Sequence, residues 1–165
     1  MDSVYIETSI VSHATAWPSS DIQIAAMQYQ ARQWWESERL SFDLVTSQLV
    51  ITEASAGDAA AAAERLKLLD GLPLVPITRE AQDLADAILA ASLMPEKAAA
   101  DALHVSIAAV SGVKYLLTLN CRHIANAHIL PQVYQLLNDA GFGQLLVCTP
   151  AEFLGGIRDV DESDT

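Results

Sequence analysis

Four residues carry carboxylate or amide side chains at positions where apolar neighbours dominate. Glu7 follows the apolar run 4–6, Glu53 lies in "LVITEAS", Asp101 lies in "AAADALHVSIAAV", and Asn120 ends "YLLTLN". A carboxylate removed from water is costly unless something pairs with it. Oxygen donors of this kind suit Mg²⁺ or Mn²⁺. Proteins bind these ions through a small number of carboxylates while several waters remain bound to the ion. The four residues therefore predict a site for a hard divalent cation, with Asn120 as a neutral donor.

Polar side chains beside these four could handle a substrate. The hydroxyls of Thr8, Ser9 and Thr118 are candidates for orienting a water or a phosphate. Arg122 or His123, just after Asn120, could contact a substrate phosphate, although a solvated loop is the simpler interpretation of that segment. The predicted substrate-binding set is Thr8, Ser9, Thr118 and Arg122.

Each candidate also has a purely structural interpretation. Glu7 could bond nearby backbone amides, Glu53 could be an exposed helix residue, and Asn120 could be a turn residue. Asp101 could cap a helix or lie in its first turn. His104, three residues after Asp101, could be a ligand or base, but a core histidine with a hydrogen-bonded ring is the favoured interpretation.

Hydrophobic periodicity and turn residues predict alternating strands and helices. The predicted strands are 4–6, 42–47, 72–77, 113–120 and 144–149, and the predicted helices are 21–39, 47–57, 58–71, 78–92, 96–112 and 126–141. His13 is predicted to lie in a loop. This order favours an α/β fold with a central parallel sheet covered by helices on both faces. Ligands of such sheets bind beyond the carboxyl ends of the strands, where Glu7 and Asn120 stand.

Composition limits the class of protein. The chain has 165 residues, of which 52% are hydrophobic, and a formal net charge of −12. We expect one domain over 1–156 and an acidic flexible tail over 157–165. The charge argues against binding nucleic acid through a broad basic surface. There is no membrane span or signal pattern, so a cytoplasmic protein is expected. Motifs for acyl transfer, nucleoside triphosphates and dinucleotides are absent.

Four segments together resemble a known family. "VYIETSIVS", "TEAS", "DALHVSIAAVSGVKYLLTLN" and "CRHIANA" resemble the PIN domain family, specifically the VapC-like ribonuclease toxins of prokaryotic type II toxin–antitoxin pairs, over roughly 4–154. The resemblance implies a three-layer α/β/α fold and an endoribonuclease site that uses Mg²⁺ or Mn²⁺. It also implies an antitoxin partner that blocks the site, and a homodimer, which the tryptophan-bearing helix 21–39 would suit.

The resemblance assigns roles by position. The family's acids fall on Glu7, Glu53, Asp101 and Asn120, and its hydroxyl positions fall on Thr8 or Ser9 and on Thr118. Where the family usually has aspartate, Glu7 is one methylene longer and Asn120 is neutral. An RNA substrate would then need a local basic strip, for which the candidates are Arg32, Arg39, Arg79, Lys97, Lys114 and Arg122.

The resulting hypothesis is a metal-dependent hydrolase that cleaves RNA phosphodiester bonds. The alternative is a non-catalytic or weakly catalytic PIN-like module that acts by association, since a partner's arginine could satisfy paired carboxylates. A phosphohydrolase acting on small phosphate esters would need an aspartate nucleophile where Glu7 stands.

Overall fold

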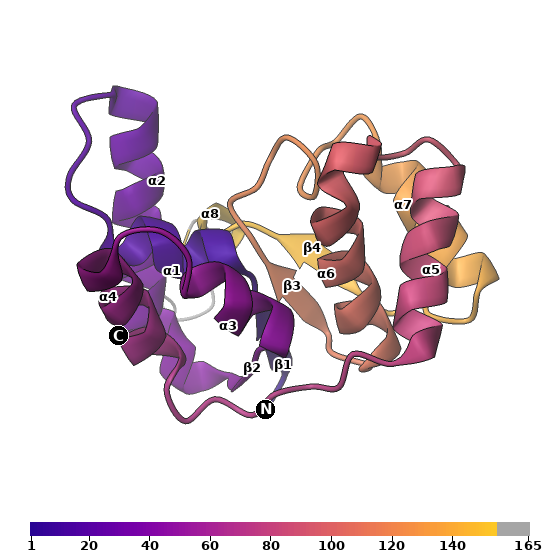
Figure 1. Ribbon diagram of the computed structural model, residues 1–165, viewed down its shortest axis with the longest axis horizontal. Coiled ribbons are helices and arrows are strands. Elements are labelled where there is room, and N and C mark those ends of the chain that lie inside the picture. The colour runs from indigo at the N-terminus through magenta and orange to yellow at the C-terminus, as the bar shows by residue number, and fades with distance from the viewer. Residues whose placement is uncertain (155–165) are drawn as a thin grey trace, which may run out of the picture.

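A four-stranded parallel sheet forms the centre of the molecule (Figure 1). The computed structural model describes residues 1–154, so the predicted acidic tail over 157–165 lies outside the described residues. Strand β1 is central and pairs with β2 and β3, giving the order β2-β1-β3-β4. The predicted α/β class with a central parallel sheet is confirmed. The strands are β1 Ser3–Ile6, β2 Asp43–Val45, β3 Tyr115–Leu117 and β4 Leu146–Cys148.

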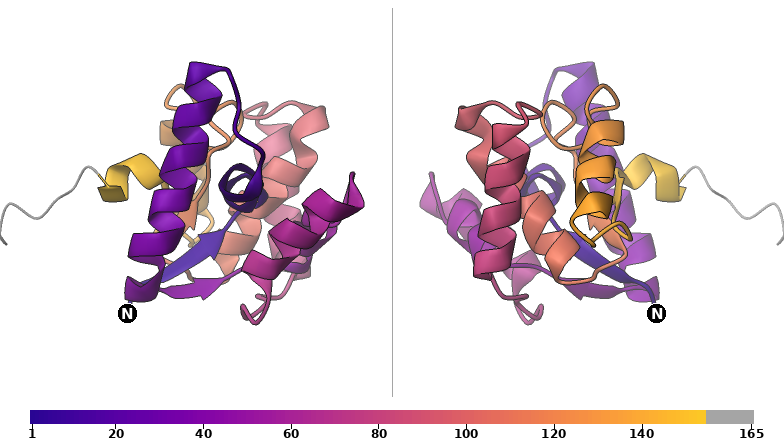
Figure 2. Two further views of the ribbon diagram at one scale, coloured as in Figure 1. Left: turned by 90° about the vertical axis from the view of Figure 1, so that its left-hand side faces the viewer. Right: turned by 90° about the vertical axis from the view of Figure 1, so that its right-hand side faces the viewer.

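Helices cover both faces of this sheet, as the three-layer fold predicts. Figure 2 shows α5 and α6 on one side of the strands and α2 and α8 on the other. A π-helix at Trp34–Glu38 and 3-10 turns at Arg39–Ser41 and Glu96–Ala98 complete the helical segments that the structure describes. The α-helices are α1 Thr8–Thr15, α2 Ile22–Gln33, α3 Gln48–Ala54, α4 Ala59–Leu69, α5 Arg79–Ala90, α6 Ala99–Val110, α7 Leu130–Asp139 and α8 Pro150–Leu154.

Side-chain caps fix the starts of several helices. Asp21, Ser47, Asp58 and Thr78 each accept a hydrogen bond from a backbone amide in the first turn of the helix that follows. These bonds satisfy amides that have no partner inside a helix. The predicted helices 21–39, 47–57, 58–71 and 78–92 begin at these four residues, so helix starts were predicted well wherever a short polar side chain precedes the helix.

The core runs along β1 and continues into an aromatic cluster. Val4, Tyr5 and Ile6 have no exposed surface. Near the first residues of β2 and β3, Trp34 stacks on Phe42, and Phe153 of α8 packs edge-on against Phe42 and Tyr115. This cluster attaches α8 to the sheet. Trp34 and Trp35 are therefore core residues of this chain.

Segment 72–77 is not the strand that its apolar pattern predicts. It makes one isolated bridge, from Leu74 to Thr46, and is otherwise irregular. Pro73 and Pro76 carry no amide hydrogen, so a regular ladder of hydrogen bonds cannot extend through them.

The helix α1 was missed, and its position changes the site. Because residues 8–15 contain Thr, Ser, Ile and Val, their helix propensity is low, yet Glu7 caps the helix and Ile10 and Val11 pack in the core. His13 therefore lies in a helix, not in the predicted loop.

Two other predicted helices differ from the structure in extent, and one helix was not predicted. The helix predicted over 21–39 is α-helical only to Gln33, α7 begins at Leu130 and not at residue 126, and the short α8 was not predicted. Tertiary packing decides such boundaries more than propensity does.

Candidate functional site

Glu7 lies where β1 ends and α1 begins. Its backbone is extended, with φ −85° and ψ 155°, and its Oε2 accepts a hydrogen bond from the amide of Ser9 at 2.6 Å. Only 4% of the residue is exposed. Burial raises the pKa of this carboxyl, and the charge of Glu53 adds to that effect, while His104 and Ser9 counteract it in part. The helix cap places Glu7, and burial favours its protonated form.

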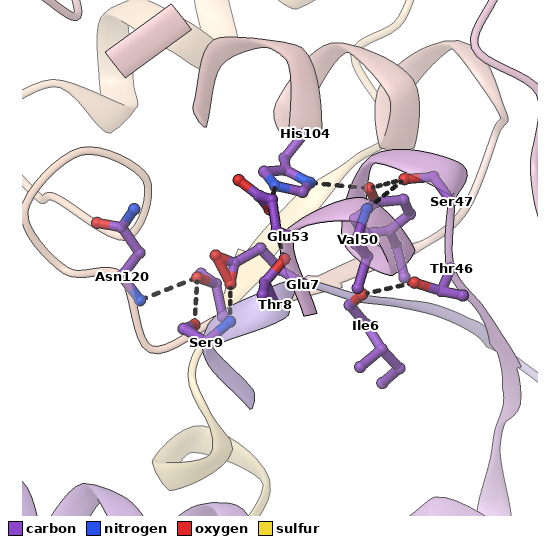
Figure 3. Close-up of polar contacts among 12 residues, drawn as sticks. Ile6, Glu7, Thr8, Ser9, Thr46, Ser47, Val50, Glu53, His104 and Asn120 are labelled. Carbon is purple, nitrogen blue, oxygen red and sulfur yellow. Dashed lines mark hydrogen bonds and ion pairs between the residues drawn. The ribbon is translucent and has the colours of Figure 1, made fainter. Parts of the chain in front are cut away.

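Glu53, in the last turn of α3, lies beside this position. Its Oε1 accepts hydrogen bonds from Thr8 Oγ1 at 2.5 Å and from His104 Nε2 at 2.6 Å (Figure 3). Burial alone would raise the pKa of Glu53, but the hydrogen bonds from His104 and Thr8 outweigh burial and lower it. The pKa values of the two neighbouring glutamates are thus shifted in opposite directions, which favours the neutral form of Glu7 and the charged form of Glu53.

A buried chain of hydrogen bonds stands behind Glu53. His104 Nδ1 lies 2.9 Å from the Tyr5 hydroxyl, which in turn lies 2.7 Å from Ser47 Oγ. His104 is 1% exposed, and Figure 3 shows it between Glu53 and Ser47. The favoured interpretation of His104, a core histidine with a hydrogen-bonded ring, is confirmed.

Asp101 and Asn120 form a second group, joined by His123. Asp101 lies in the first turn of α6, for which Ala98 is the capping position. Its Oδ2 lies 3.0 Å from His123 Nδ1, and the His123 amide donates to Asn120 Oδ1 at 3.1 Å. This confirms the first-turn interpretation of Asp101 and the turn interpretation of Asn120. The contact between Asp101 and His123 was not predicted.

Ser9 and Thr118 connect the two groups. Ser9 Oγ accepts from the Leu119 amide at 2.8 Å and lies 3.3 Å from Thr118 Oγ1, which accepts from the Asn120 amide at 2.9 Å. These bonds attach the start of α1 to the loop after β3. Thr118 has no exposed surface, so direct contact with a substrate, as predicted, is not available to it in this structure.

Thr8 and Arg122 complete the predicted substrate-binding set. The Thr8 hydroxyl donates to Glu53, and Arg122 is exposed in the turns that follow Asn120. The Arg122 carbonyl accepts from Asn126 Nδ2 at 2.8 Å, which holds the turn. The role of Arg122 in binding substrate stays a prediction.

The donors suit a hard cation, although they do not form one cage. Each of the three carboxylates uses one oxygen in the hydrogen bonds above, and the other oxygen makes none with a described residue. Within residues 1–154, no three His, Cys, Asp or Glu side chains form a group that could hold a metal ion. Mg²⁺ needs only one or two protein carboxylates when waters and phosphates complete its shell. Glu7 and Glu53, which lie next to each other in Figure 3 and of which Glu53 raises the pKa of Glu7, fit that requirement.

Sequence reasoning missed the partners of the acids more than the acids themselves. Glu53 and His104 are 51 positions apart in the chain, and Tyr5 and His104 are 99 apart. Only the three-residue spacing of Asp101 and His104, which puts both on one side of a helix, was visible in the sequence. The importance of Tyr5 and Ser47 had no signal beyond an apolar strand and a helix cap.

Fold and site together define an α/β protein with acidic and hydroxyl side chains at the carboxyl end of its central strand. The family model for the PIN domain matches residues 4–128, so the chain belongs to the PIN domain family. No curated protein and no solved structure matches the chain. PIN domains are generally nucleases that act on RNA. Among the helices of residues 1–154, none has the length and apolar character needed to cross a membrane.

Proposed function

We propose that this protein is an endoribonuclease that depends on Mg²⁺ or Mn²⁺ and hydrolyses RNA phosphodiester bonds. The observation that carries the proposal is the pair of Glu7 and Glu53 at the carboxyl end of β1, in a chain of the PIN family. Glu7 and Glu53 would hold the ion, with Asp101 and Asn120 completing the site from the other side. When bound, the ion would lower the pKa of a coordinated water and stabilise charge on the phosphoryl oxygens.

The chain's own residues then have separable tasks. Thr8 and His104 hold the Glu53 carboxylate in one orientation through its Oε1. Ser9 and Thr118 hold the loop that carries Asn120. Arg122, exposed beside that loop, contributes positive charge for the RNA backbone in an otherwise acidic protein.

The biological role that we propose is that of a VapC-like toxin in the cytoplasm, working as a homodimer. Its partner would be an antitoxin that covers the carboxylates and blocks the site. The support is the similarity of "DALHVSIAAVSGVKYLLTLN" and "CRHIANA" to such toxins. A bidentate arginine from an antitoxin would satisfy the paired carboxylates directly.

One observation favours a second candidate, a PIN-like module that binds a partner without catalysis. Two of the three carboxylates, Glu53 and Asp101, already contact histidines. A site of this kind could receive a partner's arginine with no cation present. The departures at Glu7 and Asn120 from the usual aspartates also favour a binding module without catalysis.

Cleavage of RNA by the purified full chain tests the proposal. We expect Mn²⁺ or Mg²⁺ to support cleavage, EDTA to abolish it, and Glu53→Gln or Asp101→Asn to reduce it by roughly 100-fold or more. Asp139→Asn is the matched control, because Asp139 is an exposed residue at the end of α7 that bonds only Gln135 among the described residues. Full activity in EDTA, or in Asp101→Asn, would contradict the metal-dependent assignment.

Expression in a bacterial host tests the proposed toxin role. We expect the unaltered chain to arrest growth and Asp101→Asn to be tolerated at equal protein level. Normal growth with abundant soluble protein, together with no cleavage in vitro, would support the binding module instead.

A further inference from the structure

His104 lies in the interior between β1 and α3, outside the set of proposed cation ligands. It is 1% exposed, and both of its ring nitrogens have partners, Nδ1 with the Tyr5 hydroxyl and Nε2 with Glu53 Oε1. Because rotating the ring would break both contacts in a place that water does not reach, the imidazole has one orientation.

This series of hydrogen bonds links several elements of the fold. Ser47 caps the start of α3, Tyr5 is in β1, His104 is in α6, and Glu53 is in the last turn of α3. The hydrogen bonds therefore leave α3 at one end, pass through the sheet and the neighbouring helix, and return to α3 at its other end. Both ends of α3 are thereby held relative to β1.

Hydrogen-bond accounting assigns the protons. An ionised Glu53 carboxylate only accepts, so the proton between the two residues belongs to His104 Nε2. Burial raises the pKa of the Tyr5 hydroxyl, which keeps its proton and can donate it to Nδ1. Ser47 then donates to the Tyr5 oxygen. When the His104 ring is neutral and protonated at Nε2, each polar hydrogen in the series of hydrogen bonds from Ser47 to Glu53 has an acceptor.

The other arrangement leaves a hydrogen without a partner. If Nδ1 also carried a proton, it would donate to Tyr5, and Tyr5 would donate to Ser47 Oγ. That oxygen already accepts from the Val50 amide at 3.4 Å. The Ser47 hydrogen would have no acceptor among the hydrogen bonds of the described residues, and such a buried donor is costly.

We propose that His104 is a positioning residue, held by Tyr5 and Ser47 with its proton on Nε2, that fixes the Glu53 carboxylate and so sets how tightly the site binds its cation. The inference rests on the proposed function, because it concerns the same site. Its content is that binding strength depends on residues that never contact the ion, as is common for the partners of metal ligands.

The test compares two tyrosine-to-phenylalanine variants of the full chain. Tyr5→Phe removes only the hydroxyl that holds His104. Tyr134→Phe, the matched control, removes a hydroxyl that accepts from the Val147 amide at 2.8 Å, away from the site. We expect the Mn²⁺ dissociation constant, measured by titration calorimetry, to rise about tenfold in Tyr5→Phe and to stay unchanged in Tyr134→Phe.

Two substitutions of His104 separate positioning from packing. His104→Gln keeps a donor for Glu53 and an acceptor for Tyr5, whereas His104→Leu keeps neither. We expect His104→Gln to retain clearly more Mn²⁺ affinity than His104→Leu when urea unfolding shows that both variants are folded. Equal affinity in the two folded variants would overturn the proposal.

Nitrogen NMR of the histidine rings gives a readout that needs no metal. We expect the unaltered protein to carry the His104 proton on Nε2, because the Glu53 carboxylate accepts it. A proton on Nδ1 in the unaltered protein, or unchanged Mn²⁺ affinity in Tyr5→Phe, would overturn the positioning role. If the unaltered chain bound no Mn²⁺ at all, the proposed function itself would fail, and the role toward the cation with it.

Discussion

Two carboxylate and histidine pairs flank the candidate site, and they differ mainly in the burial of the histidine. Glu53, which is 33% exposed, pairs with His104, which is 1% exposed and has both ring nitrogens bonded, whereas Asp101 pairs with His123, and these two side chains are each 20% exposed. In the first pair, turning the histidine would leave buried polar groups without partners. In the second, water can replace the contact. The same kind of carboxylate–histidine contact is thus held in one geometry on one side of the site and can rearrange on the other.

The largest expected effect is on stability when His104 is removed. His104→Ala leaves a cavity and unpartnered groups on Tyr5 and Glu53, so we expect a loss of about 3 kcal/mol in the free energy of unfolding. His123→Ala, the counterpart on the exposed side, should cost under about 1 kcal/mol. Urea denaturation of both variants measures the difference. Equal losses would mean that burial does not distinguish the two pairs.

A smaller loss of stability is expected from a change of Ser47, at the other end of the buried series of hydrogen bonds. Ser47→Ala removes the cap of α3 and also the partner of Tyr5, so we expect a loss of about 2 kcal/mol. Thr78→Ala removes only the cap of α5, through a comparable bond to the Ala81 amide, and should cost about 1 kcal/mol. If thermal and urea unfolding gave Ser47→Ala no larger loss than Thr78→Ala, the contact with Tyr5 would add nothing to stability.

The pH dependence of stability should have opposite signs at the two glutamates. The pKa of Glu7 is raised in the folded state, so its favourable contribution is present at acidic pH and is lost as pH rises through that pKa. Glu7→Gln should therefore gain stability relative to the unaltered chain as pH rises above about 4, the ordinary pKa of a glutamate.

Glu53 gives the reverse expectation. Its folded-state pKa is lowered, so its contribution is present at neutral pH and is lost as pH falls through that pKa. Glu53→Gln should be destabilised most at neutral pH, and the difference should shrink on acidification. Urea unfolding of the metal-free variants across this range measures both slopes, and slopes of the same sign would contradict the assigned pKa directions.

The smallest expected effect lies on the exposed side of the site. Arg122→Ala should leave the free energy of unfolding unchanged, because its side chain is exposed, and should weaken RNA binding by a few fold through loss of one phosphate contact. Binding measured at two salt concentrations tests this, since loss of a phosphate contact also reduces the salt dependence. A weakened fold would show that Arg122 has a structural role instead.

Much of the fold was predictable because its signals are local. Caps at Ser47 and Thr78 and the apolar stripe of α5 identify helices without knowledge of the rest of the chain. Segment 72–77 shows the limit of such signals, since its apolar pattern resembles a strand while its prolines prevent pairing. The helix α1 shows the opposite failure, a weak local signal overridden by burial of Ile10 and Val11.

The candidate site was likewise predictable only in part. That Glu7, Glu53, Asp101 and Asn120 deserve attention followed from their residue types among apolar neighbours and from strand-end positions. Their hydrogen-bond partners did not follow, because His104 of α6 and Glu53 of α3 meet only in the folded chain, and His123 meets Asp101 only through the turns after β3.

The sequence by itself therefore determined the class of fold, most helix starts and the polar residues that can carry chemistry, since propensity, capping and periodicity act over a few neighbouring residues. Only the tertiary structure decided which acid is buried, which is paired and which shares a neighbour's charge. Those properties depend on desolvation and on contacts between residues 50 to 100 positions apart, which no local pattern encodes.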